Sequence, residues 1–274
     1  MKIFEKKMGK YNVRVRKFSG IEELTGYLER TPADKGFRDT VNGSRSMTKD
    51  FNGAKSYAEA VDAMRKGVNL KDIIAAVNTG NREYSKKRNV RHISGGAPCV
   101  PAAVGSDPRA MYQKRNERIT GAYNIFVNCG VNCGVRPSQM KDAGIEILKE
   151  VMRISAIKPV NLYVGGTAID GERRNVIGYG MQIMDAGKPF NAARVSYALT
   201  EAGFFRTFGF SMYERSEGMW DSCNDWGLGS SLVDYDAALN ERVLGAAYKN
   251  MVYVNLSDVI KGKRDALKSL KAIT

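Results

Sequence analysis

The residues with the clearest chemical potential are lysines and arginines that gather in the middle of the chain. Clustered ammonium and guanidinium groups bind phosphates, because each contact neutralises a charge and releases counterions. The same clusters also occur on ordinary solvated surfaces and at helix ends, where they complement the helix dipole. We predict that this cluster contacts nucleic acid. It comprises Lys86, Lys87, Arg88, Arg91, Arg109, Lys114, Arg115 and Arg118.

Residues 214–236 reverse the local charge and hold the second group with chemical potential. Clustered carboxylates hold pairs of metal ions for phosphoryl chemistry, or act as an acid and base pair. Neither a spaced metal motif nor a nucleophile with its base can be written from these residues, so we predict a solvated insertion here. A metal-dependent enzyme remains an alternative. The residues are Glu214, Glu217, Asp221, Asp225, Asp234 and Asp236, beside Trp220 and Trp226.

Histidine, cysteine and glycine patterns give little support to other chemistries. His92 is the only histidine. Cys129 and Cys133 lie close in sequence, but Cys99 and Cys223 are distant, so a zinc site is not indicated. The glycines form neither a GxxxxGK[ST] nor a GxGxxG motif. We therefore predict reduced thiols, no metal, no cofactor and no catalytic residues.

Charge also dominates the whole composition. The 274 residues include 43 lysines and arginines against 29 acidic residues, a formal charge of +14. Such a balance favours polyanionic partners. The first 18 residues hold seven basic side chains against Glu5 alone, in an alternating pattern typical of a short strand. This segment is either a contributing nucleic-acid-binding arm or an edge strand that its charges protect.

The elements that must position these residues follow an α/β pattern. Residues 123–127 and 160–164 read as buried strands, with a helix from Pro137 between them, so we predict a βαβ unit with a parallel strand pair. Residues 178–184 are a third strand, residues 190–202 a second helix, and residues 204–212 a strand or a helix extension. The predicted fold is a three-layer, Rossmann-like or von Willebrand A-like sheet with a small, mainly helical N-terminal region.

Three parts of the chain differ in character. Residues 1–93 are basic and mostly helical by pattern, with one helix opening at Ser19, another between Ser56 and Gly67, and a third over residues 70–88. Residues 94–118 are rich in glycine and proline, which predicts a connector without a regular helix or central strand. Residues 119–274 form the predicted α/β domain.

Ligands of such sheets bind at the carboxyl ends of strands, which directs attention to residues 128–132. A von Willebrand A-like domain has a DxSxS metal motif at this point. Here Asn128, Gly130 and Asn132 occupy the corresponding positions, and they offer magnesium no carboxylate or hydroxyl. If the fold is of that type, its metal site is degenerate.

A set of motifs is spread along the chain to about residue 215. The set comprises Phe18-Ser19, Leu28, Phe51-Asn-Gly53, Ser56-Tyr-Ala-Glu-Ala60, Gly95-Gly-Ala-Pro98, Val100-Pro101, Gly105, Pro108, Met111, Val160-Asn-Leu-Tyr-Val164, Asp185-Ala-Gly-Lys-Pro189, Phe204-Phe-Arg206, Gly209-Phe210 and Glu214. Together these motifs resemble an uncharacterised family of bacteriophage proteins. The resemblance implies a viral origin without implying an activity.

Charge and resemblance together predict a phage-encoded, non-catalytic protein that binds DNA or RNA through phosphate contacts. The alternative to nucleic-acid binding is a virion, assembly or host-interaction protein that acts through protein contacts, as a homo-oligomer or in a complex with a phage or host protein. The chain has no run of about 18 apolar residues and no secretory signal pattern, so we expect no membrane partner. The expected location is the cytoplasm of the infected bacterium, or the virion.

Overall fold

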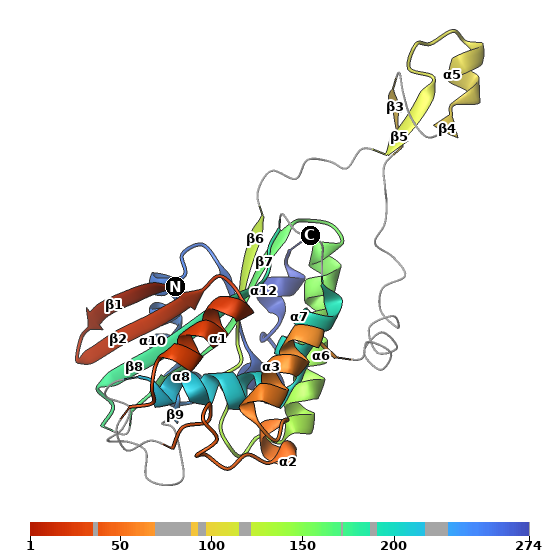
Figure 1. Cartoon of the computed structure of the whole chain (residues 1–274). Helices are drawn as coiled ribbons and strands as arrows, with labels where there is room; N and C mark the ends of the chain where they lie inside the picture. Colours follow the sequence, from red (N-terminus) through yellow and green to blue (C-terminus); the bar gives the residue numbers. More distant parts are fainter. Residues whose placement is uncertain are drawn as a thin grey trace.

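The protein is built on one mixed β-sheet with helices on both faces (Figure 1). The computed structural model describes residues 1–34, 38–68, 89–92, 97–114, 122–170, 172–186, 191–216 and 230–273. The strand order is β1-β2-β8-β7-β6-β10, and β9 pairs with the end of β7. The strands are β1 (Lys2–Met8), β2 (Tyr11–Phe18), β6 (Tyr123–Asn128), β7 (Val160–Ile169), β8 (Asn175–Met184), β9 (Ser230–Ser231) and β10 (Val252–Asn255).

Strand pairing confirms the predicted α/β class. Strand β6 runs parallel to β7 and to β10, and helix α6 (Pro137–Ser155) connects β6 to β7. Strand β8 is antiparallel to β7, β2 is parallel to β8, and β1 and β2 form an antiparallel hairpin. The division of the chain at residues 93 and 118 stays a prediction. The N-terminal hairpin nevertheless belongs to the same sheet as the strands of the C-terminal half.

Two hydrophobic cores lie on opposite faces of the sheet. The larger core contains Ile125 and Val127, and the smaller contains Phe126, because successive strand residues point to opposite faces. Among the described residues, no helix is long and apolar enough to cross a membrane. The larger core is covered by α1 (Ile21–Arg30), α3 (Tyr57–Lys66), α6, α7 (Ala192–Thr200), the π-helix η1 (Phe204–Gly209), α8 (Phe210–Glu214), α11 (Leu256–Ile260) and α12 (Lys268–Lys271), and the smaller by α9 (Leu232–Tyr235) and α10 (Ala237–Ala247).

Local sequence signals set the N-terminal helices. The Ser56 hydroxyl accepts a hydrogen bond from the Glu59 amide, and α3 ends at Gly67, whose φ is 78°, as the pattern predicted. Helix α1 also forms where predicted, but its N-cap is Gly20, and Ser19 donates to the Glu23 carboxylate rather than pairing with Glu22. A short helix, α2 (Lys49–Asn52), interrupts the polar segment between them, with Thr48 as its cap.

The glycine- and proline-rich connector contains regular structure, which corrects the prediction made for it. Strands β3 (Asn89–His92), β4 (Ala97–Pro98) and β5 (Met111–Lys114) form a small antiparallel sheet, and α5 (Val100–Val104) follows β4. The helix tolerates Pro101 because the first turn needs no amide hydrogen there. The helix expected over residues 70–88 lies outside the described residues.

The apolar segment after α7 is helical rather than extended. It forms η1 and then α8, so the helix-extension alternative is confirmed and the strand alternative is wrong. All six residues of η1 are buried, and the segment carries Phe204, Phe205 and Phe208 into the larger core.

We predict that Gly144→Ala destabilises the fold by about 1–3 kcal/mol despite the better helix propensity of alanine. A Cβ atom at Gly144 would lie 2.0 Å from the Leu199 carbonyl oxygen, so α6 and α7 would have to separate. The matched control is Gly245→Ala in α10, where a Cβ atom meets nothing within 4 Å. We expect the control to raise stability by about 0.5–1 kcal/mol. Urea unfolding measures both, and equal effects of the two variants would contradict the close packing.

Candidate nucleic-acid interface

The basic N-terminus forms a hairpin at one edge of the sheet (Figure 1). The chain turns at Gly9, whose φ is 61°, and the neighbouring side chains Lys6, Lys7 and Lys10 are exposed. We call these three residues the hairpin-tip lysines. Lys6 and Lys7 are consecutive in a strand, so they point to opposite faces of the edge. The only acidic residue of the hairpin, Glu5, accepts a hydrogen bond of 2.6 Å from Arg14 Nε.

An open hollow of about 620 Å³ lies beside the hairpin tip. Its lining combines basic and amide side chains with the start of β8. Arg174 is exposed in the preceding turn, and its carbonyl accepts a 2.8 Å hydrogen bond from the Asn12 amide. Three basic side chains against Glu5 give the lining of the hollow a net positive charge. It is lined by Glu5, Lys6, Lys7, Asn12, Val13, Arg14, Asn175 and Ile177.

A second hollow, of about 420 Å³, lies at the other end of the hairpin. Three lysines, Lys2, Lys17 and Lys249, and two tyrosines, Tyr163 and Tyr248, contribute to its wall. We call it the lysine pocket. The Lys17 ammonium donates to the Ala247 carbonyl and lies 4.7 Å from the Tyr248 ring centroid. Burial lowers the pKa of Lys17, and the positive charges of Lys2 and Lys249 lower it further.

Not every basic residue of the hairpin is available to a partner. Arg16 is buried on the α1 side, where Nη1 donates to the Ser216 hydroxyl at 3.0 Å and the guanidinium lies 5.6 Å from the Tyr27 ring centroid. Burial lowers the pKa of Arg16. This arginine joins β2 to the end of the α8 segment, so it is a structural residue.

The structure places only part of the sequence-predicted basic cluster. Arg91 lies in β3 opposite Tyr112, and Lys114 lies in β5 opposite Asn89. Arg109 is exposed after α5 and pairs with Asp107 at 3.7 Å. Its role, like that of the whole cluster, stays a prediction. Lys86, Lys87, Arg88, Arg115 and Arg118 lie outside the described residues.

One family model covers nearly the whole chain. A family model described as a domain of unknown function, DUF7192, matches residues 5–272. The chain belongs to this family. The match includes β2, β8 and β10, so the hairpin and the strands around it form part of the family's domain. No curated protein and no solved structure matches the chain.

The carboxyl ends of β6, β7 and β10 hold a network of amides in this DUF7192 domain. Asn128 Oδ1 accepts from the Gly130 amide at 2.9 Å, and Asn128 Nδ2 lies 3.2 Å from Thr167 Oγ1 and 3.3 Å from Asn240 Oδ1. Asn240 Nδ2 donates to Asn255 Oδ1 at 3.2 Å. These oxygens therefore already accept hydrogen bonds where a metal motif was considered. Among the described residues, no three carboxylate, cysteine or histidine side chains converge on a metal position.

The cysteine pair beside this network consists of free thiols, as predicted. Cys129 is buried in the larger core, and burial raises its pKa to about 12. Cys133 is exposed. A thiol with a raised pKa is a poor nucleophile at neutral pH, so Cys129 serves packing.

The described acidic residues of the 214–236 segment have structural partners. Asp236 caps α10 by accepting from the Leu239 amide at 2.8 Å. Asp234 accepts from the Ser257 hydroxyl at 2.7 Å and pairs with Lys261. Glu214 is fully buried and has partners of its own. Asp234, Asp236 and Glu214 therefore each have their own hydrogen-bond donors, and they share none of the partners named here. Glu217, Asp221 and Asp225 lie outside the described residues.

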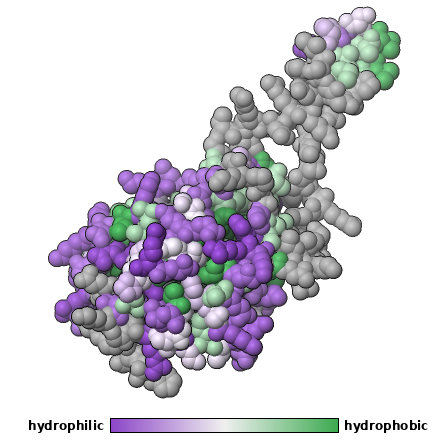
Figure 2. All heavy atoms as spheres, viewed as in Figure 1, coloured by the Kyte–Doolittle hydropathy of each residue, from purple (hydrophilic) through white to green (hydrophobic). Residues whose placement is uncertain are grey.

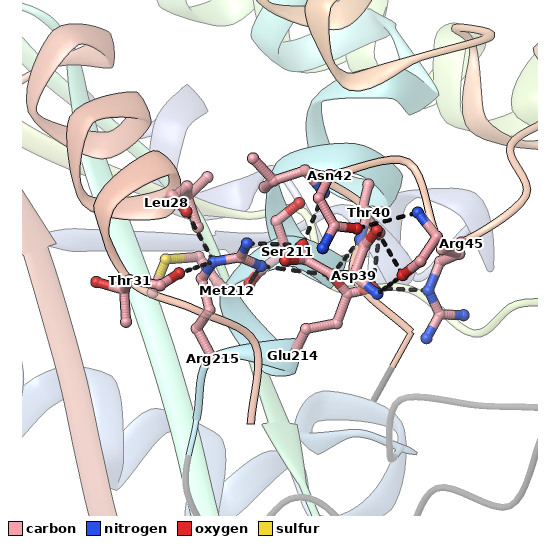
Figure 3. Close-up of polar contacts among 12 residues, drawn as sticks. Leu28, Thr31, Asp39, Thr40, Asn42, Arg45, Ser211, Met212, Glu214 and Arg215 are labelled. Carbon is pink, nitrogen blue, oxygen red and sulfur yellow. Dashed lines mark hydrogen bonds and ion pairs between the residues drawn. The ribbon is translucent and has the colours of Figure 1, made fainter. Parts of the chain in front are cut away.

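Glu214 and Arg215 fasten the long segment after α1 to the larger core (Figure 3). Glu214 accepts from the Thr40 amide at 2.9 Å, the Thr40 hydroxyl at 2.6 Å and Arg45 Nε at 2.6 Å. Arg215 donates to the Leu28 and Thr31 carbonyls and to Asp39 Oδ1. The charge pattern alone offers Glu214 as a carboxylate for the enzyme alternative, because its partners at residues 40 and 45 are distant in the sequence.

We predict that Thr40→Val lowers stability by about 1.5–3 kcal/mol at pH 7, because a buried ionised carboxylate loses a hydrogen bond. Burial raises the pKa of Glu214, and the Thr40 bonds act in the opposite direction. The contribution of this carboxyl to folding is therefore full below its unfolded pKa of about 4.3 and falls as pH rises through the folded pKa.

Because the lost hydroxyl matters most to the ionised form, we expect a larger loss at pH 7 than at pH 4. Chemical unfolding at both pH values measures it. Thr40→Ser keeps the hydroxyl and is the control. A serine variant as unstable as the valine variant would assign the effect to the methyl group and not to the hydrogen bond.

Proposed function

We propose that the protein binds nucleic acid, DNA or RNA, through phosphate contacts and without catalysis. The observation that carries the proposal is the basic hairpin at the edge of the sheet, where Lys2 and the hairpin-tip lysines are exposed. The hairpin-tip lysines are exposed beside an open hollow, so a polyanion can approach from the edge and from either face. The predicted cluster from Lys86 to Arg118 is the second part of the proposed interface.

The geometry of the hairpin suits a flexible strand. Residues in a β-strand advance by about 3.3 Å, so Lys2 and Lys6 on the same face are separated by about 13 Å along the edge. A single-stranded backbone can follow such a row of charges with little regard to base sequence. Tyr11 adds a ring at the tip, where the Lys10 ammonium lies 5.2 Å from its centroid. Bases can stack on such a ring.

The setting of the proposal comes from the resemblance to bacteriophage proteins. We place the activity in the cytoplasm of an infected bacterium, with the virion as the other location. The resemblance supports only this location. The charged surface of the hairpin supports nucleic acid as the ligand.

We predict that changing Lys6, Lys7 and Lys10 together to Ala weakens binding of labelled single-stranded DNA or RNA by about tenfold or more. Each lost phosphate contact also lowers the salt dependence, by about 0.7 in the slope of log affinity against log salt concentration. Fluorescence anisotropy at about 50 and 200 mM salt measures both quantities. A parallel variant, Lys86, Lys87 and Arg88 to Ala, measures the contribution of the sequence-predicted cluster.

The matched control removes the same charge elsewhere. Lys66, Lys149 and Lys268 are surface lysines on three helices, and each pairs with a neighbouring acid. Changing these three to Ala should leave binding nearly unchanged. An equal loss in the control would show a response to net charge alone. Absence of binding by the unaltered protein at the lower salt concentration would refute the proposed function.

One observation favours the alternative of a protein–protein contact. Val100 and Val104 lie four residues apart on α5 and are 64% and 82% exposed. Figure 2 shows hydrophobic residues at the surface of the small unit that holds α5. Exposed apolar patches of this kind are typical of binding surfaces. A second copy of the chain is the partner that this alternative names.

For this alternative, we predict that Val100→Ser with Val104→Ser shifts the protein toward monomers in sedimentation velocity, with little dependence on salt. The variant removes the apolar contact that the two valines would make with a second copy. It changes no basic residue, so phosphate contacts would remain. Ala103→Ser on the same helix is the control, because Ala103 is also exposed and small. A monomer at every concentration of the unaltered protein would remove self-association through α5.

A further inference from the structure

We propose that the lysine pocket binds a phosphate monoester carried by a nucleoside, the chemistry of a 5′-nucleotide or of the phosphorylated end of a strand. The inference rests on the proposed function for its strand-end source. It adds a site that recognises an end rather than the continuous backbone.

Converging positive charge is the first argument. Lys2 and Lys17 are directly opposite each other in the β1–β2 register, and Lys249 follows α10 into the same wall. The acid in the lining, Glu23, is already engaged by the Ser19 amide and hydroxyl at 2.7 and 2.9 Å and by the N-terminal amine. Three ammonium groups in one wall repel one another, and a bound anion relieves that repulsion.

The charge of the ligand follows from this arrangement. A phosphodiester carries one negative charge, whereas a phosphate monoester carries about −1.5 to −2 at pH 7 and offers three acceptor oxygens. Lys17 uses one donor on the Ala247 carbonyl, and an ammonium group has three. Lys17 therefore keeps donors for a ligand, and the group of three lysines favours the more highly charged monoester.

A buried hydroxyl is the second argument. Tyr248 lines the pocket and is 3% exposed, and its hydroxyl is one of six buried hydroxyls that have no hydrogen-bond partner among the residues that the structure describes. Buried polar groups are nearly always paired, so such a group requires an explanation. Gly180 makes its position possible, because a Cβ atom there would lie 2.2 Å from the Tyr248 hydroxyl oxygen. Gly180 is the register partner of Lys17, which places the hydroxyl next to the charged wall.

The volume and the lining of the pocket indicate which group carries the phosphate. A volume of about 420 Å³ exceeds the need of a phosphate group and lies within the range of small-molecule sites. The rings of Tyr163 and Tyr248 lie 5.7 Å apart, and Gln182 adds an amide to the lining. The partly exposed ring of Tyr163 beside a cationic group suits a nucleoside better than an aliphatic alcohol.

The test compares single-stranded oligonucleotides of one sequence that carry a 5′-phosphate, a 3′-phosphate or hydroxyls at both ends, with AMP and inorganic phosphate as competitors. We expect either phosphorylated end to bind about tenfold tighter than the hydroxyl ends. Lys249→Gln and Tyr248→Phe should reduce this preference several-fold. The phenylalanine variant removes no hydrogen bond seen in the structure, so it should fold normally, as circular dichroism would check. Changing Lys6, Lys7 and Lys10 to Ala should weaken all three oligonucleotides equally and leave the preference intact.

The outcomes separate the two proposals. Equal affinity for phosphorylated and hydroxyl ends, without competition by AMP, would overturn the pocket and leave the proposed function standing. Displacement or direct binding of AMP without any oligonucleotide binding would support the pocket as a free-nucleotide site and refute the proposed function. A preference that survives both Lys249→Gln and Tyr248→Phe would overturn the assignment to this pocket. Inorganic phosphate that competes as well as AMP would overturn the nucleoside part.

Discussion

The parallel pairing of β2 with β8 is the contact on which the charged surfaces depend. Seven consecutive register pairs, from Asn12 with Asn175 to Phe18 with Met181, attach the basic hairpin to the sheet. Two glycines in β8 allow neighbouring side chains to pack closely against this strand pair. A Cβ atom at Gly178 would lie 3.1 Å from a Val15 methyl group, and one at Gly180 would collide with Tyr248. Without this attachment, Lys17 would meet neither Ala247 nor the Tyr248 ring.

Buried arginines explain why net charge alone is a poor guide to the binding surface. Arg16, Arg206 and Arg215 are all buried on the side of the larger core, and each donates to backbone carbonyls or hydroxyls. Arg206, within η1, donates to the Phe51 carbonyl at 2.9 Å and stacks 4.0 Å from the Phe51 ring centroid. A guanidinium offers five donors in a fixed plane, so one side chain fastens several loops. These three charges count toward the total without facing a partner.

Sequence reasoning succeeded where the signal is local. The strand at 123–127, the helix from Pro137 and the cap at Ser56 follow from periodicity and capping within a few residues. It failed where the cause is distant. The partners of Glu214 come from residues 40 and 45, and the lysine pocket joins residues near the two ends of the chain. Composition identified the basic N-terminus, but no local pattern shows that Lys17 and Lys249 share a wall.

The lysines of β1 can have a purely structural role, which is to protect an edge strand. The two hollows help to distinguish this role from ligand binding. An edge strand with unpaired backbone groups invites pairing with another chain, and exposed lysines prevent it. That role explains Lys6 and Lys7, which need only be charged and solvated. It does not explain Lys2, Lys17 and Lys249, because protection of an edge requires neither convergence from two ends of the chain nor a buried hydroxyl beside the charges. Convergence raises the electrostatic free energy of the folded protein, since like charges approach one another as one of them is desolvated. Edge protection gains nothing from that cost, whereas an anion site recovers it each time the ligand binds.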